Sequence, residues 1–328
     1  MGSVIIHPQK LKKGDLIRVV APSYSMQLVP KKILEMAAKR FDDMGLIVSF
    51  GKNTGKKDIL ESTSIDDRLE DLNEAFIDKK VRGIICAIGG YNSNFLLDRI
   101  DWDILKSNPK FFGGFSDITV LNNAIYKMTG MVTYQMPNFR NFGQKLGFEY
   151  SLDYFKKIAM SSEPVEVSQS EKWSDDKWTK DQAKRKFIEN NGWWLLGEGV
   201  AKGITLGGNL CSLNLLQGTK YMPEIEDKIL FIEDDAMSTV GEFSRNLRSL
   251  FHVSGAGEIK ALILGRFQKK TKMNRTKLEM IIDDIPELRN KPVLANVDFG
   301  HTDPKITWMV GGTTEIEVGQ GKSRLILT

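Results

Sequence analysis

Cysteine is scarce in this chain, and long apolar runs are missing from it. Among 328 residues only Cys86 and Cys211 occur. Both lie in apolar surroundings, GIICAIGG and NLCSLNLL, which predict buried reduced thiols rather than a disulfide. The longest apolar runs, such as ILFI and ALIL, are far below the roughly 18 residues of a membrane helix, and the N-terminus does not have the pattern of a secretory signal. We therefore expect a cytoplasmic protein without a membrane partner.

A large excess of charge of one sign is also absent. The chain carries 46 Lys and Arg residues against 42 Asp and Glu residues, a net charge of +4, which is too small and too dispersed to indicate a nucleic-acid partner. The one basic run, RFQKKTKMNRTK from Arg266, predicts a solvated loop and the start of a helix, with phosphate binding as the second interpretation. The nucleotide-binding patterns G-x-x-x-x-G-K-[ST] and, at the first strand–helix turn, G-x-G-x-x-G do not occur.

The first half of the chain alternates strand-like and helix-like segments, which is typical of a parallel α/β sheet. Strands are expected over 15–23, 46–51, 81–88, 111–115 and 131–137, and helices over 30–45, 64–79, about 95–105 and 117–128. Polar, tryptophan-bearing sequence without a clear period follows, and after it glycine-rich strands and further helices. We predict an N-terminal domain over 1–150, a linker and substrate-facing insert over 151–191, and a second domain over 192–328.

Three loops of the first half come directly after predicted strands: APSYS, GGYNSN and GGFSD. The carboxyl ends of the strands are where an α/β sheet binds its ligand. All three loops are rich in small residues, which allow a substrate to approach backbone N–H groups at helix N-termini. We expect the three loops to form one site.

The GGFSD corner places Ser116 between a strand and a helix, as in a nucleophile elbow. The match to the hydrolase pattern G-x-S-x-G is partial, because Ile118 stands where the last glycine belongs. Serine is also a preferred helix N-cap, and the corner alone favours that interpretation.

A serine nucleophile needs a base, and the base needs an acid to orient it. Of the three histidines, His7 lies in the N-terminal arm and His252 at the end of a predicted helix, whereas His301 follows a predicted strand in FGHTDPK. Glu233 is the first carboxylate after the strand KILFI. His301 and Glu233 can each also be interpreted without catalysis, His301 as a histidine in a turn and Glu233 as a solvated loop acid. Together with Ser116 they indicate a hydrolase.

Six motifs in order, LKKGDLIRVVAPS, AIGGYNSNFLLDRID, NPKFFGGFSDITVL, GITLGGNLCSLNLLQGT, ILFIEDD and FGHTDPK, resemble the LD-carboxypeptidase family of serine peptidases. The loop GGYNSN and the insert WSDDKW are more similar to its microcin C self-immunity branch. The resemblance implies a flavodoxin-like N-terminal domain with a parallel sheet, a smaller mixed α/β C-terminal domain that supplies the acid and the base, a homodimer, and no metal or other cofactor.

The resemblance also implies roles for particular residues. Ser116, Glu233 and His301 would form the catalytic triad, and the backbone N–H groups of Asp117 and Gly90 would hold the oxyanion. The expected substrate-binding residues are Gly89, Asn92, Ser93, Trp173 and Trp178. In the self-immunity branch an aromatic side chain stacks on a nucleobase, and the two tryptophans are candidates for it. Packing of the linker against a domain is an equal alternative for either one.

In that branch the enzyme cleaves the amide that joins a C-terminal aspartyl residue to a modified adenylate. One alternative keeps the triad and changes the substrate, so that the enzyme trims the terminal D-alanine from murein tetrapeptides. A second alternative, from another class, is a non-catalytic module whose GGYNSN and GGFSD loops bind a nucleotide.

Overall fold

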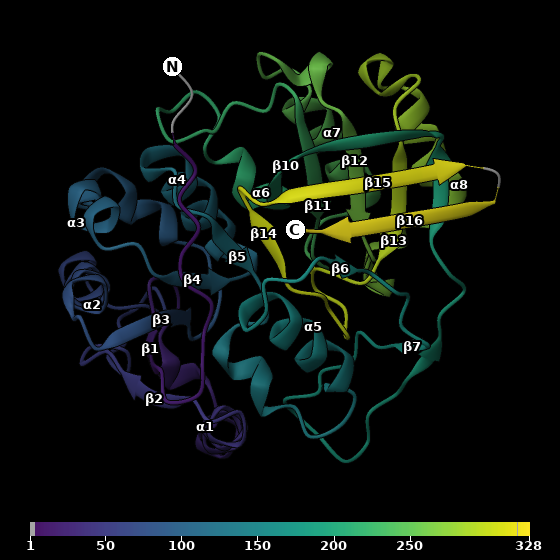
Figure 1. Cartoon of the computed structure of the whole chain (residues 1–328). Helices are drawn as coiled ribbons and strands as arrows, with labels where there is room; N and C mark the ends of the chain where they lie inside the picture. Colours follow the sequence, from purple (N-terminus) through teal and green to yellow (C-terminus); the bar gives the residue numbers. More distant parts are fainter. Residues whose placement is uncertain (1–3, 320) are drawn as a thin grey trace.

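The computed structural model describes residues 4–319 and 321–328, and its N-terminal part is a parallel sheet flanked by helices (Figure 1). The chain alternates strands and helices here as predicted. The elements are β1 (Leu16–Val20), α1 (Lys31–Asp43), β2 (Ile47–Phe50), α2 (Ile65–Ile77), β3 (Val81–Cys86), α3 (Trp102–Ser107), β4 (Phe111–Gly114), α4 (Thr119–Thr129) and β5 (Thr133–Gln135). Short 3₁₀ helices η1 (Met26–Leu28), η2 (Ser93–Arg99), η3 (Ser116–Ile118) and η4 (Phe139–Gly143) lie in loops of this part.

Local sequence explains why these elements form. Helix α1 buries Ile33, Ala37 and Phe41, which recur at helical spacing on one face. The side chain of Ser64 accepts a hydrogen bond from the N–H of Asp67 and so caps α2. Strand β3 is buried at five of its six positions, which is typical of a strand covered on both faces.

The strand order of this sheet is β14-β5-β4-β3-β1-β2, and all neighbours except β14 and β5 are parallel. Without β14, this is the order 2-1-3-4-5 of flavodoxin-like folds. The predicted fold of the N-terminal domain is therefore confirmed. The loops after β1, β3 and β4 meet at the carboxyl edge of the sheet, next to the point where the strand order reverses.

The second half forms a mixed sheet. Its elements are β9 (Trp194–Gly197), β10 (Gly199–Asn209), α6 (Leu210–Asn214), β11 (Lys228–Glu233), α7 (Val240–Leu250), η5 (Ala256–Glu258), β12 (Ala261–Gly265), η6 (Lys269–Thr271), α8 (Arg275–Asp283), η7 (Pro286–Leu288), β13 (Val293–Val297), β14 (Trp308–Val310), β15 (Thr313–Gly319) and β16 (Lys322–Leu327). The eight strands run in the order β6-β16-β15-β10-β11-β12-β13-β9, with β10 to β13 parallel and the others antiparallel to their neighbours. The predicted mixed character of this part is confirmed.

One strand of the second half belongs to the first sheet. Strand β14 pairs antiparallel with β5, with Trp308 opposite Gln135. Side chains of α4 also reach the second sheet, since Asn123 donates its amide to the carbonyl oxygen of Gly207 in β10 at 2.8 Å. These contacts fix the carboxyl ends of β4 and β11 relative to each other.

The segment between the two sheets has more structure than the sequence predicts. Helix α5 (Glu149–Ala159) begins it and buries Tyr154, Phe155 and Ile158. The short strands β6 (Val165–Glu166), β7 (Lys172–Trp173) and β8 (Ile188–Glu189) follow. The prediction of a segment without a period is therefore wrong for its first turns.

The two cysteines differ in their environment. Cys86 is buried in β3 as predicted, but Cys211 is exposed, which corrects the prediction of a core thiol. Cys211 lies in the short helix α6, whose buried residues are its neighbours Leu210, Ser212 and Leu213. The apolar neighbours in sequence therefore point to the core, whereas Cys211 points away from it.

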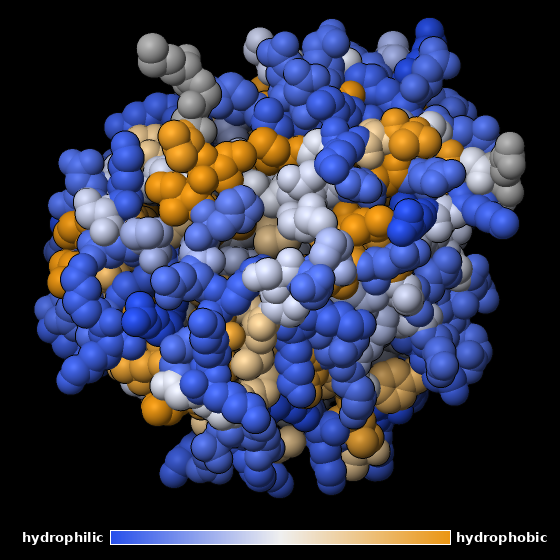
Figure 2. Space-filling model, in the orientation of Figure 1, coloured by the Kyte–Doolittle hydropathy of each residue, from blue (hydrophilic) through white to orange (hydrophobic). Residues whose placement is uncertain are grey.

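The surface has no obvious continuous apolar area on the side shown in Figure 2. Hydrophilic residues cover most of this face, and apolar residues gather in smaller separate patches. In the described part of the chain, every helix is too short or too polar to cross a membrane.

Candidate active site

Ser116 occupies a strained turn directly after β4. Its φ is +67°, in the left-handed region that residues other than glycine rarely adopt. The turn is held from behind, because the N–H of Phe115 donates to Oδ1 of Asn138 at 3.1 Å. Strand, strained serine and following helix are the local geometry of a nucleophile elbow, and the side chain is only partly exposed.

The structure brings Ser116, His301 and Glu233 into one hydrogen-bonded row. Nε2 of His301 lies 3.0 Å from Oγ of Ser116, and Nδ1 of His301 lies 2.7 Å from Oε2 of Glu233. The His301 side chain is 18% exposed and the Glu233 side chain 4%. Since 2.6–3.2 Å is the range in which a base reaches a nucleophile, the geometry suits transfer of the serine proton to the imidazole.

Two glycines make room for the acid of this row. Glu233 ends β11, and a Cβ on Gly265 of the neighbouring strand would lie 2.8 Å from its Cβ. Gly300, with φ +94°, directly precedes His301, and a Cβ there would lie 2.5 Å from Oε2 of Glu233. The histidine loop can approach the buried carboxylate because residue 300 has no side chain.

Electrostatics raise the pKa of His301 above its ordinary value of 6.5. Burial by itself lowers this pKa, but the charge and hydrogen bond of Glu233 outweigh burial, and Asp235 adds to the rise. Lys305 acts in the opposite direction. The carboxylates on one side of the ring therefore stabilise the imidazolium that forms when His301 accepts a proton.

The loop after β3 passes directly beside Ser116. A Cβ on Gly89 would lie 3.0 Å from Oγ of Ser116 and 3.6 Å from the backbone nitrogen of Asp117. Asp117 stands in the first turn of η3, where N–H groups have no partner within the helix. The Gly89 backbone and the backbone nitrogen of Asp117 therefore lie next to Ser116, where the sequence predicts the oxyanion hole.

The side chain of Asp117 ties the three predicted loops together. Its Oδ2 accepts hydrogen bonds from Oγ of Ser23 at 2.5 Å and from the N–H of Ser93 at 2.9 Å, and its carbonyl oxygen accepts one from Oγ of Ser93 at 2.8 Å. Ser23 follows β1 and Ser93 follows β3. The loops therefore form one site, as expected from the sequence.

Two expected substrate-binding residues have structural partners instead. Ser93 is fully buried by its bonds to Asp117, and Asn92 is 5% exposed. Nη1 of Arg68 donates to both the carbonyl oxygen and Oδ1 of Asn92. Neither residue lines the cavity beside Ser116, so the contacts of this pair hold the loops together.

A cavity of about 200 Å³ opens beside Ser116 and His301. Gly89 and Gly90 line it, as expected. Its other lining residues are Tyr24, Ile88, Tyr91, Phe115, Asn138, Arg140 and Asp235. Tyr24 and Tyr91 pack edge to face with ring centroids 5.8 Å apart, and Tyr91 is 62% exposed at the mouth.

The structure does not bring the two candidate tryptophans to this cavity. Trp178 is 7% exposed and belongs to the core. The ring of Trp173 lies under the guanidinium of Arg266, 5.2 Å from its centroid. The insert instead packs behind the histidine loop, because backbone bonds join Ser174 to Asp303 at 2.7 and 2.8 Å.

Arg140 is the functional candidate that the sequence reasoning missed. Its side chain lines the cavity, and its buried Nε has no hydrogen-bond partner among the described residues. Burial lowers the pKa of Arg140, although the charge of Asp303 raises it. Arg140 comes soon after β5, the strand beside β4, so inspection of the loop after every parallel strand would have found it.

No group of three or more His, Cys, Asp or Glu side chains within residues 4–319 and 321–328 is arranged to hold a metal ion.

Comparison with known families matches both halves of the chain. Residues 17–136 match the LD-carboxypeptidase N-terminal domain, and residues 202–316 match the LD-carboxypeptidase C-terminal domain. Among curated proteins, the chain is 42% identical to the putative carboxypeptidase YocD of Bacillus subtilis, over 98% of both chains. It is 30% identical to the microcin C7 self-immunity protein MccF of Escherichia coli, over 92% of this chain and 90% of that protein.

Solved structures agree with these matches. A MccF-like protein from Bacillus anthracis superimposes with a TM-score of 0.97 at 44% identity, covering 98% of this chain and 99% of that one. MccF in complex with aspartyl sulfamoyl adenosine superimposes with a TM-score of 0.86 at 29% identity, covering 98% of each chain.

Proposed function

The chain belongs to the LD-carboxypeptidase family of serine peptidases and is a serine hydrolase, and from this premise we propose that it hydrolyses the amide between an acidic aminoacyl group and a modified adenylate. The observation that carries the proposal is the row of Ser116, His301 and Glu233, with 3.0 and 2.7 Å between successive partners. Family membership favours this reading over a non-catalytic nucleotide-binding module.

The reaction is an acyl transfer to Ser116. Oγ attacks the carbonyl carbon of the scissile amide while Nε2 of His301 takes the hydroxyl proton, and Glu233 stabilises the resulting imidazolium. The N–H groups of Asp117 and Gly90 hold the oxyanion. His301 then protonates the leaving nitrogen as the carbon–nitrogen bond breaks, and water, activated by the same imidazole, releases the acyl group from the serine.

Recognition of the acyl group is assigned to Arg140. Arg140 lines the cavity beside Ser116, and its buried Nε lacks a partner among the described residues. A substrate carboxylate in this cavity would bind the guanidinium through charge-assisted hydrogen bonds, worth roughly 1.5–3 kcal/mol. Replacing Arg140 by methionine should therefore raise KM for an acidic substrate by about tenfold or more, with a smaller rise in Arg140→Lys.

Recognition of the nucleobase is assigned to the tyrosines rather than the tryptophans. Tyr91, 62% exposed at the mouth and packed against Tyr24, presents a ring face on which a base can stack. Support for a nucleotide also comes from MccF, which has been crystallised with aspartyl sulfamoyl adenosine.

The murein alternative uses the same machinery. An LD-carboxypeptidase that trims D-alanine from murein tetrapeptides would need Ser116, His301 and Glu233 in the same row, and Arg140 would bind the terminal carboxylate. The family's two domain names favour this substrate, so the test must offer both.

Mass spectrometry of two parallel incubations decides between the substrates. One contains aspartyl sulfamoyl adenosine and the other a murein tetrapeptide, each with the wild type, with Ser116→Ala, and with Ser107→Ala as a matched control at the far edge of the same sheet. Release of aspartate and sulfamoyl adenosine by the wild type and the control, but not by Ser116→Ala, supports the proposal. Release of D-alanine alone would replace it with the murein activity.

A homodimer in the cytoplasm is part of the same proposal. Light scattering after size-exclusion chromatography tests the dimer, for which a mass near twice 37.0 kDa is expected.

A further inference from the structure

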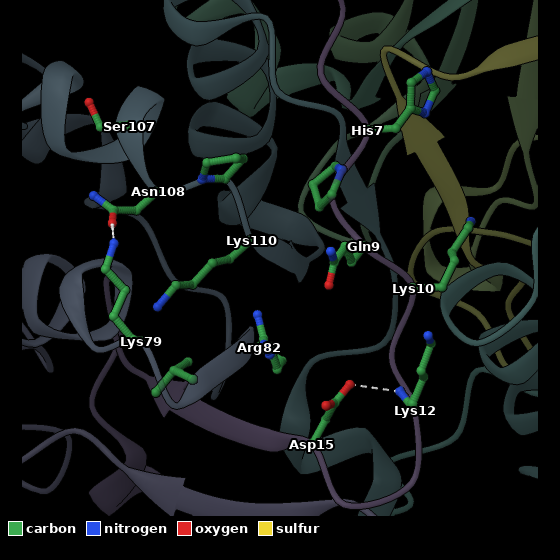
Figure 3. A pocket seen from close by; sticks show the side chains of 13 residues that line it. His7, Gln9, Lys10, Lys12, Asp15, Lys79, Arg82, Ser107, Asn108 and Lys110 are labelled. Atoms are coloured by element: carbon green, nitrogen blue, oxygen red, sulfur yellow. Dashed lines mark hydrogen bonds between the residues drawn. The ribbon is translucent and has the colours of Figure 1, made fainter.

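A second cavity lies at the edge of the N-terminal sheet opposite Ser116. Its volume is about 450 Å³, within the range of pockets for small molecules. The segment before β1, the start of β3 and the loop between α3 and β4 surround it (Figure 3). None of the residues that line the cavity beside Ser116 lines this one, so its ligand would be distinct from the substrate.

Cationic side chains dominate the walls of this cavity. The cations are Lys10, Lys12, Lys79, Arg82 and Lys110, and the single carboxylate is that of Asp15. The carboxylate accepts a hydrogen bond from the backbone N–H of Lys12 at 2.7 Å. Within the part of the chain that the structure describes, none of the five cations forms an ion pair.

Two of the lysines, Lys110, which is buried, and Lys10, which is partly buried, donate to backbone carbonyl groups. Nζ of Lys110 donates to the carbonyl oxygens of Ala75 and Asp78, at the end of α2. Nζ of Lys10 donates to the carbonyl oxygen of Ile158, near the end of α5. Helix ends of this polarity attract cations, which accounts for these two lysines.

That structural role does not extend to the other three cations. Lys12, Lys79 and Arg82 are exposed around the cavity. Lys79 donates to Oδ1 of Asn108 at 2.7 Å, a neutral oxygen. The exposed cations therefore remain without a counter-charge.

The pKa of Lys110 reflects the positive surroundings. The pKa is lowered to about 8, mainly by burial; the charges of Lys79, Arg82 and Arg18 contribute to the fall, and the charge of Asp78 opposes it. Burial also lowers the pKa of His7 on the cavity wall, and the charge of Lys10 adds to that effect. An anion in the cavity would relieve this repulsion.

We propose that the cavity binds a small polyanion with a chain of phosphate groups, either free or attached to a nucleoside. Several cations around one enclosed space match an anion with several charges close together. The fork of Arg82 and the ammonium groups of Lys12 and Lys79 are the donors that phosphate oxygens prefer. The cavity volume of about 450 Å³ suits a small molecule.

Calorimetric titration with tripolyphosphate at low ionic strength tests the proposal. The key variant is K12Q/K79Q, and the matched control is K13Q/K80Q, which removes two positive charges from the adjacent, exposed positions that do not line the cavity. We expect Kd to rise at least tenfold in K12Q/K79Q and less than twofold in K13Q/K80Q. Both variants should hydrolyse the substrate at the rate of the wild type.

Further ligands identify the source of the phosphate chain. ATP can also enter the cavity beside Ser116. ATP binding to the basic cavity is therefore taken as the difference between binding to the wild type and binding to K12Q/K79Q. If ATP binds as tightly as tripolyphosphate, the cavity recognises the phosphate groups alone. If ATP binds more tightly, the cavity also contacts the nucleoside. Both results support the site. An equal loss in both double variants, no tripolyphosphate binding by the wild type at millimolar concentration, or equally tight citrate binding would overturn it.

Discussion

The carboxyl edge and the amino edge of the N-terminal sheet carry different charged groups: a buried carboxylate at the first and several lysines at the second. At the carboxyl edge, the carboxylate of Asp117 ties together the loops after β1, β3 and β4, and Ser116 stands among them with φ +67°. At the amino edge, Lys110 and Lys10 bond to carbonyl groups at helix ends, and further cations line the same cavity. Helices begin at the first edge and end at the second, so N–H groups face one cavity and carbonyl groups the other.

The two edges of the sheet therefore suit different tasks: one holds atoms at fixed distances, and the other gathers positive charge. Catalysis needs a few atoms at fixed distances, which the carboxyl edge supplies through hydrogen bonds between loops. Binding of a polyanion needs only an excess of cations around a space; at the amino edge, backbone carbonyl groups hold two of these cations, and three more are exposed. Changes at the first edge should therefore alter reaction rates, and changes at the second should not.

The largest effect is expected for Ser116→Ala. Loss of the nucleophile should lower kcat by at least about 10³-fold, since removal of one triad member costs this much in other serine hydrolases. Ser107→Ala at the amino edge should leave kcat within twofold. Steady-state kinetics and circular dichroism check both variants, and a similar loss in the two would break the distinction between the edges.

The second-largest fall in kcat is expected for Glu233→Gln. The amide can still bond to Nδ1 of His301, now 2.7 Å from the carboxylate, but it does not stabilise the imidazolium. We expect kcat to fall by about 10²- to 10⁴-fold. A fall of less than tenfold, measured on a folded variant, would remove Glu233 from the proposed mechanism.

Gly300→Ala should lower both activity and stability. The new methyl group would lie 2.5 Å from Oε2 of Glu233, on a residue with φ +94°, at a cost of about 1–3 kcal/mol. Gly241→Ala is the control, because a Cβ there has no atom within 4 Å. Urea denaturation should show a lower free energy of unfolding for Gly300→Ala only; equal values for the two variants would contradict the close approach.

The smallest effect is a shift in pH dependence. His301 accepts a proton only when neutral, so kcat/KM should fall as the pH drops through its pKa, which is raised above 6.5. Because Asp235 contributes to this rise, Asp235→Asn should lower the pKa of His301 and move the acid limb to lower pH. Asp103→Asn at the start of α3 should not move it, and a shift of the Asp235→Asn profile to higher pH would contradict the sign.

Much of the fold and the core of the candidate site follow from local sequence. Strand and helix periods predict the alternating elements of the N-terminal sheet, and its flavodoxin-like fold is implied by the family resemblance. The rule that ligands bind at strand ends leads to Ser116, Glu233 and His301. What local sequence does not provide is the packing of the insert. Arg185, with 1% of its side chain exposed, pairs with Asp176 and Asp303 at 2.7 and 3.4 Å and fixes the insert behind the histidine loop.

Local sequence does not show long-range contacts, and this also explains the other differences between the predictions and the structure. Trp173 and Trp178 looked available because the segment around them is polar, yet long-range contacts decide where it lies. The three residues of β14 join the first sheet only because α4 and β5 already pack against the second. The basic cavity draws its cations from positions 10 to 110, and no window of sequence shows them together.

A double-variant cycle tests the central claim most directly. The values of kcat/KM are measured for Ser116→Ala, His301→Ala and the double variant, with the substrate that the wild type cleaves. If the two residues act as one unit, the double variant should be no slower than either single variant. Losses that multiply in the double variant would show that the two side chains contribute independently, and would contradict the proposed transfer of the proton from Ser116 to His301.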